Sequence, residues 1–113
     1  SMDLNPAEFL FVYMTFPNRE EAERVGTMLV EEHLAACVNI TDGMQSVYRW
    51  QGRVERASET VCIAKTKVAL FDALERRVQA LHPYECPCIV AMPLAAASPS
   101  YLQWLDEQVK DGE

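Results

Sequence analysis

No run of apolar residues in this chain of 113 residues approaches the roughly 18–20 that a membrane-spanning helix needs. Basic residues are also scarce, because ten Lys and Arg stand against 17 Asp and Glu and give a net charge of −7. Contacts to phosphate supply most of the affinity of nucleic-acid-binding proteins, so this charge argues against nucleic acid as a partner, and weakly against an anionic membrane surface. The N-terminus has no basic stretch ahead of its apolar run, so we expect no signal peptide and a cytoplasmic protein.

The common catalytic motifs are missing as well. The chain has no G-x-S-x-G nucleophile elbow, no GK[ST] loop and no glycine-rich loop to cradle a phosphate after its first apolar run, where Pro17-Asn18-Arg19 stands instead. His33 lies late in a predicted helix and is expected at the surface rather than acting as a base. The segment 59–65, ETVCIAK, has no aromatic residue on which RNA bases would stack. We therefore expect a binding or assembly protein and not an enzyme.

Four cysteines are present: Cys37, Cys62, Cys86 and Cys88. A reducing compartment favours free thiols for all of them. Cys86 and Cys88 are the closely spaced pair, but C-x-C is not the paired C-x₂₋₄-C spacing of zinc sites, and one intervening residue would strain a disulfide between them. They can be small buried hydrophobic residues or thiol ligands that share one face of a strand.

The stretch from Met44 to Lys67 predicts a long β-hairpin with its turn at Gln51-Gly52 and a bulge at Ala57-Ser58. The first arm can be followed back to Cys37, so positions 37–50 would span roughly 46 Å at about 3.3 Å per residue. A compact domain of this size is only about 35 Å across. Unless Gly43 bends it back, the arm extends beyond the core and exposes backbone groups that pair with another chain. The hairpin therefore predicts an oligomer.

The remaining pattern predicts the other elements of one domain, residues 8–110. Residues 1–7 are expected to be disordered, with Ser1-Met2 left by a cleaved tag, and 110–113 to be loose. Asn18 is a predicted N-cap, and Pro83 is expected to end the second helix. The predicted elements are a central or doubly covered strand over 8–16, a helix over 19–34, a helix over 68–81, a strand over 88–92 and a helix over 99–109.

This order, β-α-β-β-α-β with a C-terminal helix, is that of the ferredoxin-like plait, an α+β fold. It predicts an antiparallel sheet with two helices on one face. The other face must then be covered by the terminal helix or by neighbouring subunits.

Four segments carry a resemblance over about residues 9–108. They are LAACVNI at 34–40, VYRWQG at 47–52, HPYE at 82–85 and PSYLQWL at 99–105, and Lys65-Thr66 also fits. In this order and spacing they resemble the CutA family of divalent-cation tolerance proteins. The resemblance implies a small homotrimer whose long hairpins pair strands across subunits. It also implies tolerance of copper and other divalent cations, with copper binding proposed.

Carried over to this sequence, the resemblance makes Cys37 and His82 the metal ligands. Cys86, Cys88 and Glu85 are weaker candidates because of their position close to His82 in the sequence, and relatives often have other residues in place of the two thiols. Thiolate and imidazole suit copper. From the residues alone, Cys37 can instead be a buried hydrophobic residue, and His82 can instead cap the last carbonyls of the preceding helix.

Six residues match motif positions and would line a cleft between subunits or anchor the interface. They are Tyr48, Trp50, Glu59, Lys65, Tyr84 and Trp104. We expect the ligand near His82, Tyr84 and Glu85, where Pro83 ends a helix and its negative end favours a cation. A nearby Lys65 would favour an anion instead. The alternative function is a trimeric scaffold or signalling module that binds a small ligand or a partner protein, without metal, at clefts between subunits.

Overall fold

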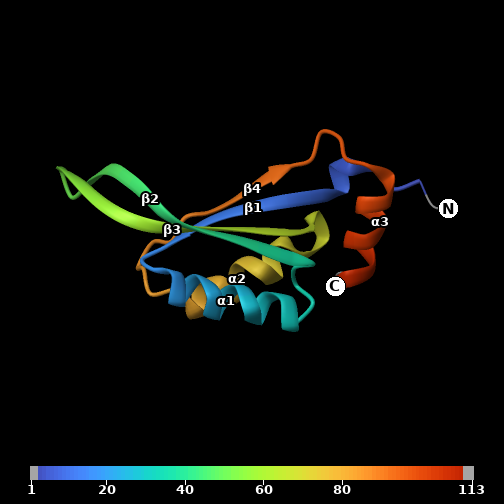
Figure 1. Ribbon diagram of the computed structural model, residues 1–113, viewed down its shortest axis with the longest axis horizontal. Helices are drawn as coiled ribbons and strands as arrows, with labels where there is room; N and C mark the ends of the chain where they lie inside the picture. The colour runs from blue at the N-terminus through green and yellow to red at the C-terminus, as the bar shows by residue number, and fades with distance from the viewer. Residues whose placement is uncertain (1–2, 111–113) are drawn as a thin grey trace.

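The computed structural model describes residues 3–110, in which four strands form one antiparallel sheet in the order β2-β3-β1-β4 (Figure 1). The strands are β1 (Phe9–Phe16), β2 (Cys37–Trp50), β3 (Arg53–Lys67) and β4 (Ile89–Pro93). The helices are α1 (Arg19–Glu31), α2 (Phe71–Leu81) and α3 (Pro99–Gln108), with short 3₁₀ turns η1 (Pro6–Glu8) and η2 (Val68–Leu70). The predicted α+β class, with helices packed on an antiparallel sheet, is confirmed.

The hydrophobic core lies between the sheet and the pair α1 and α2, which cover one face together (Figure 1). Val12, Met14 and Phe16 alternate along β1 and are fully buried, in one cluster with residues of both helices such as Leu29 and Leu74. β1 lies between β3 and β4, so the apolar first strand is central, as its sequence predicts.

Helix α1 begins as predicted and ends earlier than predicted. The side chain of Asn18 accepts a hydrogen bond of 2.9 Å from the backbone N–H of Glu21. The expected helix to residue 34 is wrong, because His33 has a left-handed φ of 60°. The N–H groups of Leu34 and Ala35 then both turn back to the carbonyl of Leu29, at 2.9 and 3.1 Å. Such a turn closes a helix by satisfying its last carbonyls.

Several of the other boundaries differ by one to three residues from those predicted. The second helix opens as the 3₁₀ turn η2, and α2 itself starts at Phe71 without a side-chain cap. It ends at Leu81, with His82 extended ahead of Pro83, as expected. The fourth strand begins at Ile89 instead of residue 88, and α3 ends at Gln108.

The N-terminal stretch has a defined course from Asp3, where disorder was expected. Asn5 caps η1 by accepting a bond of 3.0 Å from the backbone N–H of Ala7. Residues 1–2 and 111–113, and with them the predicted tag remnant and most of the predicted loose tail, lie outside the described residues.

Strands β2 and β3 form the long hairpin that the sequence predicts. Gln51 and Gly52 turn the chain with φ values of 51° and 80°, the left-handed pair of a tight hairpin. The predicted bulge at Ala57-Ser58 is wrong, since both residues stay in register with β2. The register shift lies instead between Thr41 and Met44 on the first arm, around Gly43, whose φ is 81°.

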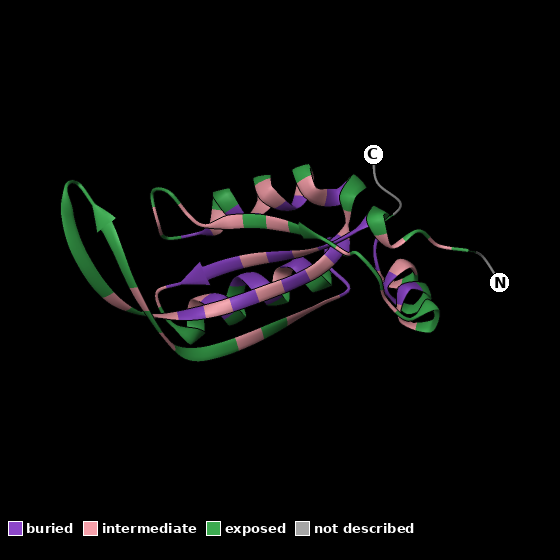
Figure 2. Cartoon of the chain, turned by 90° about the horizontal axis from the view of Figure 1, so that it is seen from above, coloured by how far each residue is buried: buried purple, intermediate pink, exposed green. Residues whose placement is uncertain are grey.

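Gly43 does not fold the arm back onto the core, and the hairpin projects from the domain (Figure 1). The chain measures 52 × 25 × 22 Å along its principal axes. Figure 2 shows the projecting part exposed, in contrast to the buried central strands. Val47 and Val54 on it are 58% and 59% exposed. A two-stranded ribbon with exposed apolar residues is marginally stable by itself in water.

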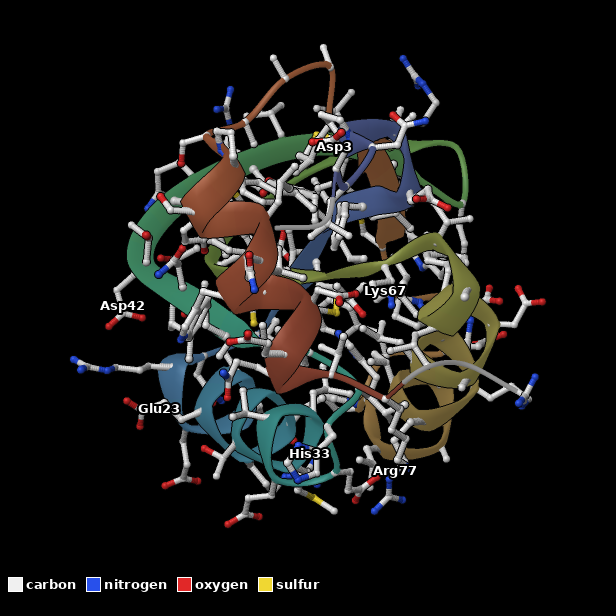
Figure 3. All side chains as sticks on the ribbon, turned by 90° about the vertical axis from the view of Figure 1, so that its right-hand side faces the viewer. Asp3, Glu23, His33, Asp42, Lys67 and Arg77 are labelled. Carbon is white, nitrogen blue, oxygen red and sulfur yellow. The ribbon has the colours of Figure 1, made fainter. Side chains whose placement is uncertain are left out.

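Helix α3 lies at the end of the sheet away from the hairpin tip (Figure 1). It is tied there by Lys67 of β3, whose Nζ donates to the carboxylate of Asp106 at 2.6 Å. At the same end, His33 contacts the carbonyl of Gln108 through Nδ1 at 3.1 Å; Figure 3 labels Lys67 and His33 there. Val90 and Met92 of β4 pair with Tyr13 and Phe11 and remain 51% and 42% exposed. The sheet face opposite α1 and α2 is therefore partly uncovered in one chain.

Gly26 sets how closely α1 approaches β2. A Cβ atom at this position would lie 2.9 Å from Cγ2 of Val38, which is closer than carbon atoms pack. Gly26→Ala should cost about 1–3 kcal/mol of overpacking, against about 1 kcal/mol that alanine gains over glycine in a helix.

The neighbouring substitution Thr27→Ala is the control, because Thr27 is exposed on the same helix. We expect urea unfolding, at one protein concentration, to find Gly26→Ala less stable than Thr27→Ala by about 0.5–2.5 kcal/mol, because Thr27→Ala itself gains about 0.5 kcal/mol of helix propensity. Equal stability of the two variants would contradict the close approach of α1 to β2.

Candidate ligand-binding cleft

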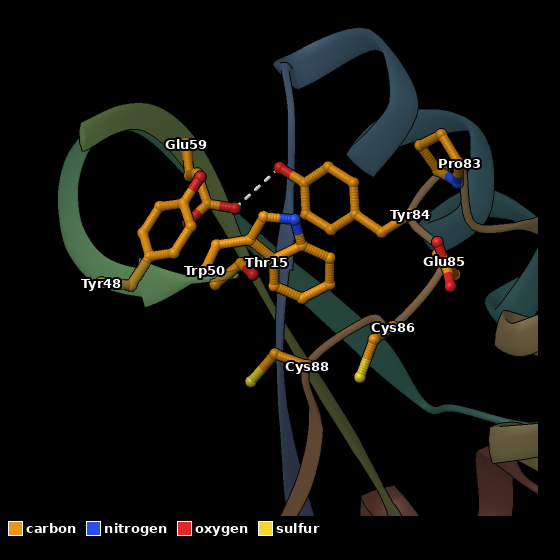
Figure 4. A pocket seen from close by; sticks show the side chains of 9 residues that line it. All are labelled: Thr15, Tyr48, Trp50, Glu59, Pro83, Tyr84, Glu85, Cys86 and Cys88. Carbon is orange, nitrogen blue, oxygen red and sulfur yellow. Dashed lines mark hydrogen bonds between the residues drawn. The ribbon is translucent and has the colours of Figure 1, made fainter. Parts of the chain in front are cut away.

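A cleft of about 470 Å³ lies between the curved hairpin and the connection from α2 to β4 (Figure 4). We call it the hairpin cleft. Its lining residues are Thr15 of β1, Tyr48 and Trp50 of β2, Glu59 of β3, and Pro83, Tyr84, Glu85, Cys86 and Cys88 of the connection. This volume is in the range of small-molecule sites. Seven of the predicted site residues line it. The other four, Cys37, His82, Lys65 and Trp104, do not.

The centre of the hairpin cleft is a hydrogen bond between Tyr84 and Glu59. The phenol of Tyr84 donates to the Glu59 carboxylate at 2.7 Å (Figure 4). Burial and this carboxylate raise the pKa of Tyr84 above its usual value, so the phenol stays protonated and remains a donor. Burial, and then the charge of Glu59, also raise the pKa of the Cys88 thiol.

His82 lies behind the cleft and is buried, with 8% of its surface exposed. Its Nε2 donates to the carbonyl of Thr15 at 2.7 Å, and its Nδ1 accepts from the backbone N–H of Tyr84 at 3.1 Å. The ring also stacks on Phe16, with centroids 4.3 Å apart. Because both ring nitrogens already bond to backbone groups, His82 could bind a metal only by giving up one of these bonds. Its contacts make it a positioning residue that fixes Tyr84 against β1.

The last carbonyl of α2 is bonded by another residue, which the sequence did not indicate. Arg24 of α1 donates to the carbonyl of Leu81 at 2.8 Å and to the carboxylate of Glu21 at 2.9 Å. The side chain of Arg24, and not that of His82, therefore caps the last carbonyl of α2. The sequence around an arginine on the polar side of one helix does not indicate that its side chain contacts a second helix.

The remaining predicted site residues form a second group beside α3. Cys37 and Lys65 pair across β2 and β3, and Lys65 pairs with Phe11 of β1. The thiol of Cys37 lies 4.0 Å from the hydroxyl of Tyr101, and Nζ of Lys65 lies 5.6 Å from the centroid of the same ring. Trp104 packs on Tyr101 at 5.7 Å between centroids. We call this group the α3 cluster.

The two groups are separated along the sheet. Phe11 marks the α3 cluster and Thr15 the hairpin cleft, and four residues of a strand span about 13 Å. Within one chain the structure therefore does not bring Cys37 and His82 together, and Lys65 does not line the hairpin cleft.

Metal-binding chemistry within one chain is limited. Among residues 3–110, no three side chains of His, Cys, Asp or Glu lie close enough together to hold an ion. All four cysteines have free thiols, as predicted for a reducing compartment. Burial raises the pKa of Cys62 to about 12, which keeps that thiol protonated. Within the same range, no helix has the length and apolar character needed to cross a membrane.

The fold and cleft define a small α+β protein with a four-stranded antiparallel sheet, a projecting hairpin and a ligand-sized cleft beneath it. Residues 10–108 match the family described as CutA1 divalent ion tolerance protein. The chain belongs to this family.

Individual members of the family are also similar to the chain. The chain is 49% identical over 96 residues to the divalent-cation tolerance protein CutA of Thermus thermophilus, covering 85% of this chain and 93% of that protein. It is 41% identical over 102 residues to the chloroplastic protein CutA of Arabidopsis thaliana, covering 90% of this chain but 56% of that protein. A solved divalent cation tolerance protein from Thermus thermophilus superimposes with a TM-score of 0.88 at 46% identity, covering 90% of this chain and 99% of that one. A solved CutA1 from Oryza sativa gives 0.89 at 39% identity, covering 92% and 95%.

The contacts of His82 predict a pH-dependent stability. Burial lowers the pKa of His82, against the opposing effect of its bond to Thr15, so the unfolded chain binds its proton more readily than the folded chain. The stability from His82 is therefore present above about pH 6.5, the usual pKa of histidine, and is lost as pH falls through the lower folded value.

We expect His82→Asn to flatten the fall in stability between pH 7 and pH 5, measured by urea unfolding at fixed protein concentration. It should also cost about 1–3 kcal/mol at pH 7, because a buried carbonyl or N–H loses its partner. His33→Asn is the control for replacing a histidine at the surface, where its ring contacts the carbonyl of Gln108, and His82→Asn should flatten the profile more than this control does. An unchanged profile in His82→Asn would rule out this role.

Proposed function

We propose that the chain is a cytoplasmic, homotrimeric divalent-cation tolerance protein with the ferredoxin-like plait, and that the hairpin cleft is its ligand site. The observation that carries the proposal is the lining of this cleft. Two carboxylates and two thiols face it together with three aromatic side chains, and none of its nine lining residues, all within the described range, is basic. Such a surface attracts cations.

Membership of the family supports a role in tolerance of divalent cations. The two Thermus thermophilus relatives named above, one a sequence and one a solved structure, are called divalent-cation tolerance proteins, and neither name states an enzymatic activity. Copper, or another divalent cation, is the proposed ligand. The two thiols Cys86 and Cys88 suit copper in its soft Cu(I) form, and Glu59 and Glu85 suit harder divalent ions.

The homotrimer is supported by two surfaces that one chain leaves uncovered. The projecting hairpin exposes apolar side chains, including Tyr48 at 43% and Trp50 at 47%. The sheet face that carries Val90 and Met92 is also partly exposed. β2 and β4 are the edge strands, whose free backbone groups pair readily with another chain. Pairing between copies would cover both surfaces at once.

The donors of one chain do not fit a complete metal site. A divalent ion commonly takes four or more ligands, whereas no three donors cluster within residues 3–110. Metal binding at the hairpin cleft therefore requires ligands from a neighbouring subunit, or two-coordinate binding by Cys86 and Cys88. The pair Cys37 and His82 is less favoured, because the two lie apart and His82 is already bonded.

A second candidate is the trimeric scaffold that binds a small ligand without metal. Its support is the aromatic lining of the cleft by Tyr48, Trp50 and Tyr84, which metal binding does not use. Aromatic side chains with a few placed polar groups are typical of sites for organic ligands.

Titration of the reduced protein with Cu(I), Cu(II) and Zn(II), followed by calorimetry, separates these candidates. We expect stoichiometric binding that weakens at least about tenfold in the double variant Cys86→Ser, Cys88→Ser, because serine is a poor ligand for soft ions. Cys37→Ser is the matched control and should bind as the parent does.

Loss of binding in Cys37→Ser, with binding intact in the double variant, would move the metal site to the α3 cluster. Absence of any binding below millimolar metal would contradict direct metal binding and favour the scaffold.

A further inference from the structure

We infer that the hairpin cleft binds a small alkylated ammonium ion, held against the faces of Tyr48, Trp50 and Tyr84 with Glu59 as its counter-ion. The inference rests on the proposal that this cleft is the ligand site. It goes beyond that proposal by naming an organic cation as the ligand class.

The first argument is the kind of surface that the cleft presents. Two neighbouring positions of β2 on one face, Tyr48 and Trp50, meet Tyr84 from the α2–β4 connection across the cleft (Figure 4). Aromatic faces attract cations through their negative quadrupole, and the effect is strongest for weakly hydrated organic ammonium ions in partly desolvated sites. In one chain Tyr48 and Trp50 are 43% and 47% exposed. Binding of the ion requires that the proposed trimer leave the cleft faces of both rings open.

The second argument is charge. Glu59 lies among the three aromatic residues and accepts the Tyr84 hydroxyl at 2.7 Å, which holds both groups in place (Figure 4). Glu85 adds a second carboxylate, and Lys65, which would have opposed a cation, lies in the α3 cluster. The charge of the lining is therefore complementary to a cation and not to an anion.

The third argument is that the cleft lacks the ligands that a metal ion needs. No three metal-ligating side chains cluster among the described residues. Glu59 already accepts the bond from Tyr84, and the volume of about 470 Å³ far exceeds that of a single ion. An alkylated ammonium ion needs no inner ligands, since its charge is spread over methyl groups that pack against rings.

Tetramethylammonium is the probe, and tert-butanol, which is neutral and of similar size, is the matched control ligand. Binding is followed in the full chain by the fluorescence of Trp50, at constant ionic strength kept with sodium chloride. The background variant Trp104→Phe leaves Trp50 as the single tryptophan; Trp104 packs on Tyr101 in the α3 cluster and not in the hairpin cleft.

We expect saturable binding of tetramethylammonium at millimolar concentration or below, and a preference of about tenfold or more over tert-butanol. Glu59→Gln keeps an acceptor for Tyr84 but loses the charge, and should reduce the preference at least about threefold. Trp50→Leu removes one of the rings and should weaken binding similarly when followed by the NMR signals of Tyr84, in protein that sediments with the same mass as the parent.

Equal binding of the two ligands, a preference unchanged in Glu59→Gln, or no binding of tetramethylammonium below about 50 mM would overturn the inference. The last result includes the case in which a neighbouring subunit fills the cleft. These outcomes are independent of the metal titration, because a cleft that binds Cu(I) through Cys86 and Cys88 but not tetramethylammonium leaves the proposed function intact.

Discussion

The ladder between β2 and β3 extends far past the core that the rest of the chain provides. Its inner half contributes to the core through one face of β3, where Cys62 and Ala64 are inaccessible and belong to the cluster beneath α1 and α2. Its outer half, from Met44 to Glu59, keeps cross-strand pairing but contains no buried residue, and most of its residues are exposed. A two-stranded ribbon gains little stability without a surface to cover it. The length of this hairpin is therefore the constraint that shapes the uncovered edge, the cleft beneath it and the need for a partner.

The cleft depends on the hairpin on one side and on His82 on the other. The hairpin supplies Tyr48, Trp50 and Glu59, whereas the opposite wall is a connection without regular structure. His82 holds that connection by bonding to Thr15 on β1 and to the backbone of Tyr84, and the bond from Tyr84 to Glu59 then closes the link to β3. A wall with so little secondary structure keeps its position through these three bonds, which makes a buried histidine important to the site without contact with a ligand.

Much of the fold followed from local signals in the sequence. Asn18 fixed the start of α1, Pro83 the end of α2 and Gln51-Gly52 the turn, because each acts within a few residues of its own position. The site was harder to predict, because it depends on register. The resemblance implied that Cys37 and His82 bind one metal together, yet the pairing of Cys37 with Lys65 places that thiol beside α3. The partner of His82 is a carbonyl 67 residues away, and the bonds of Arg24 cross between helices, so neither contact leaves a trace in the local sequence.

The central claim is that the projecting hairpin is stable because it assembles with other copies of the chain. Sedimentation equilibrium at micromolar concentration tests it with the intact chain and a variant in which Asn-Gly replaces residues 47–56. That replacement joins the paired residues Ser46 and Ala57 by a tight two-residue turn and leaves the core ladder in place. The account predicts three times the mass of one chain for the intact protein, and a folded monomer by circular dichroism for the variant. A monomeric intact protein, or a variant that still sediments as a trimer, would contradict it.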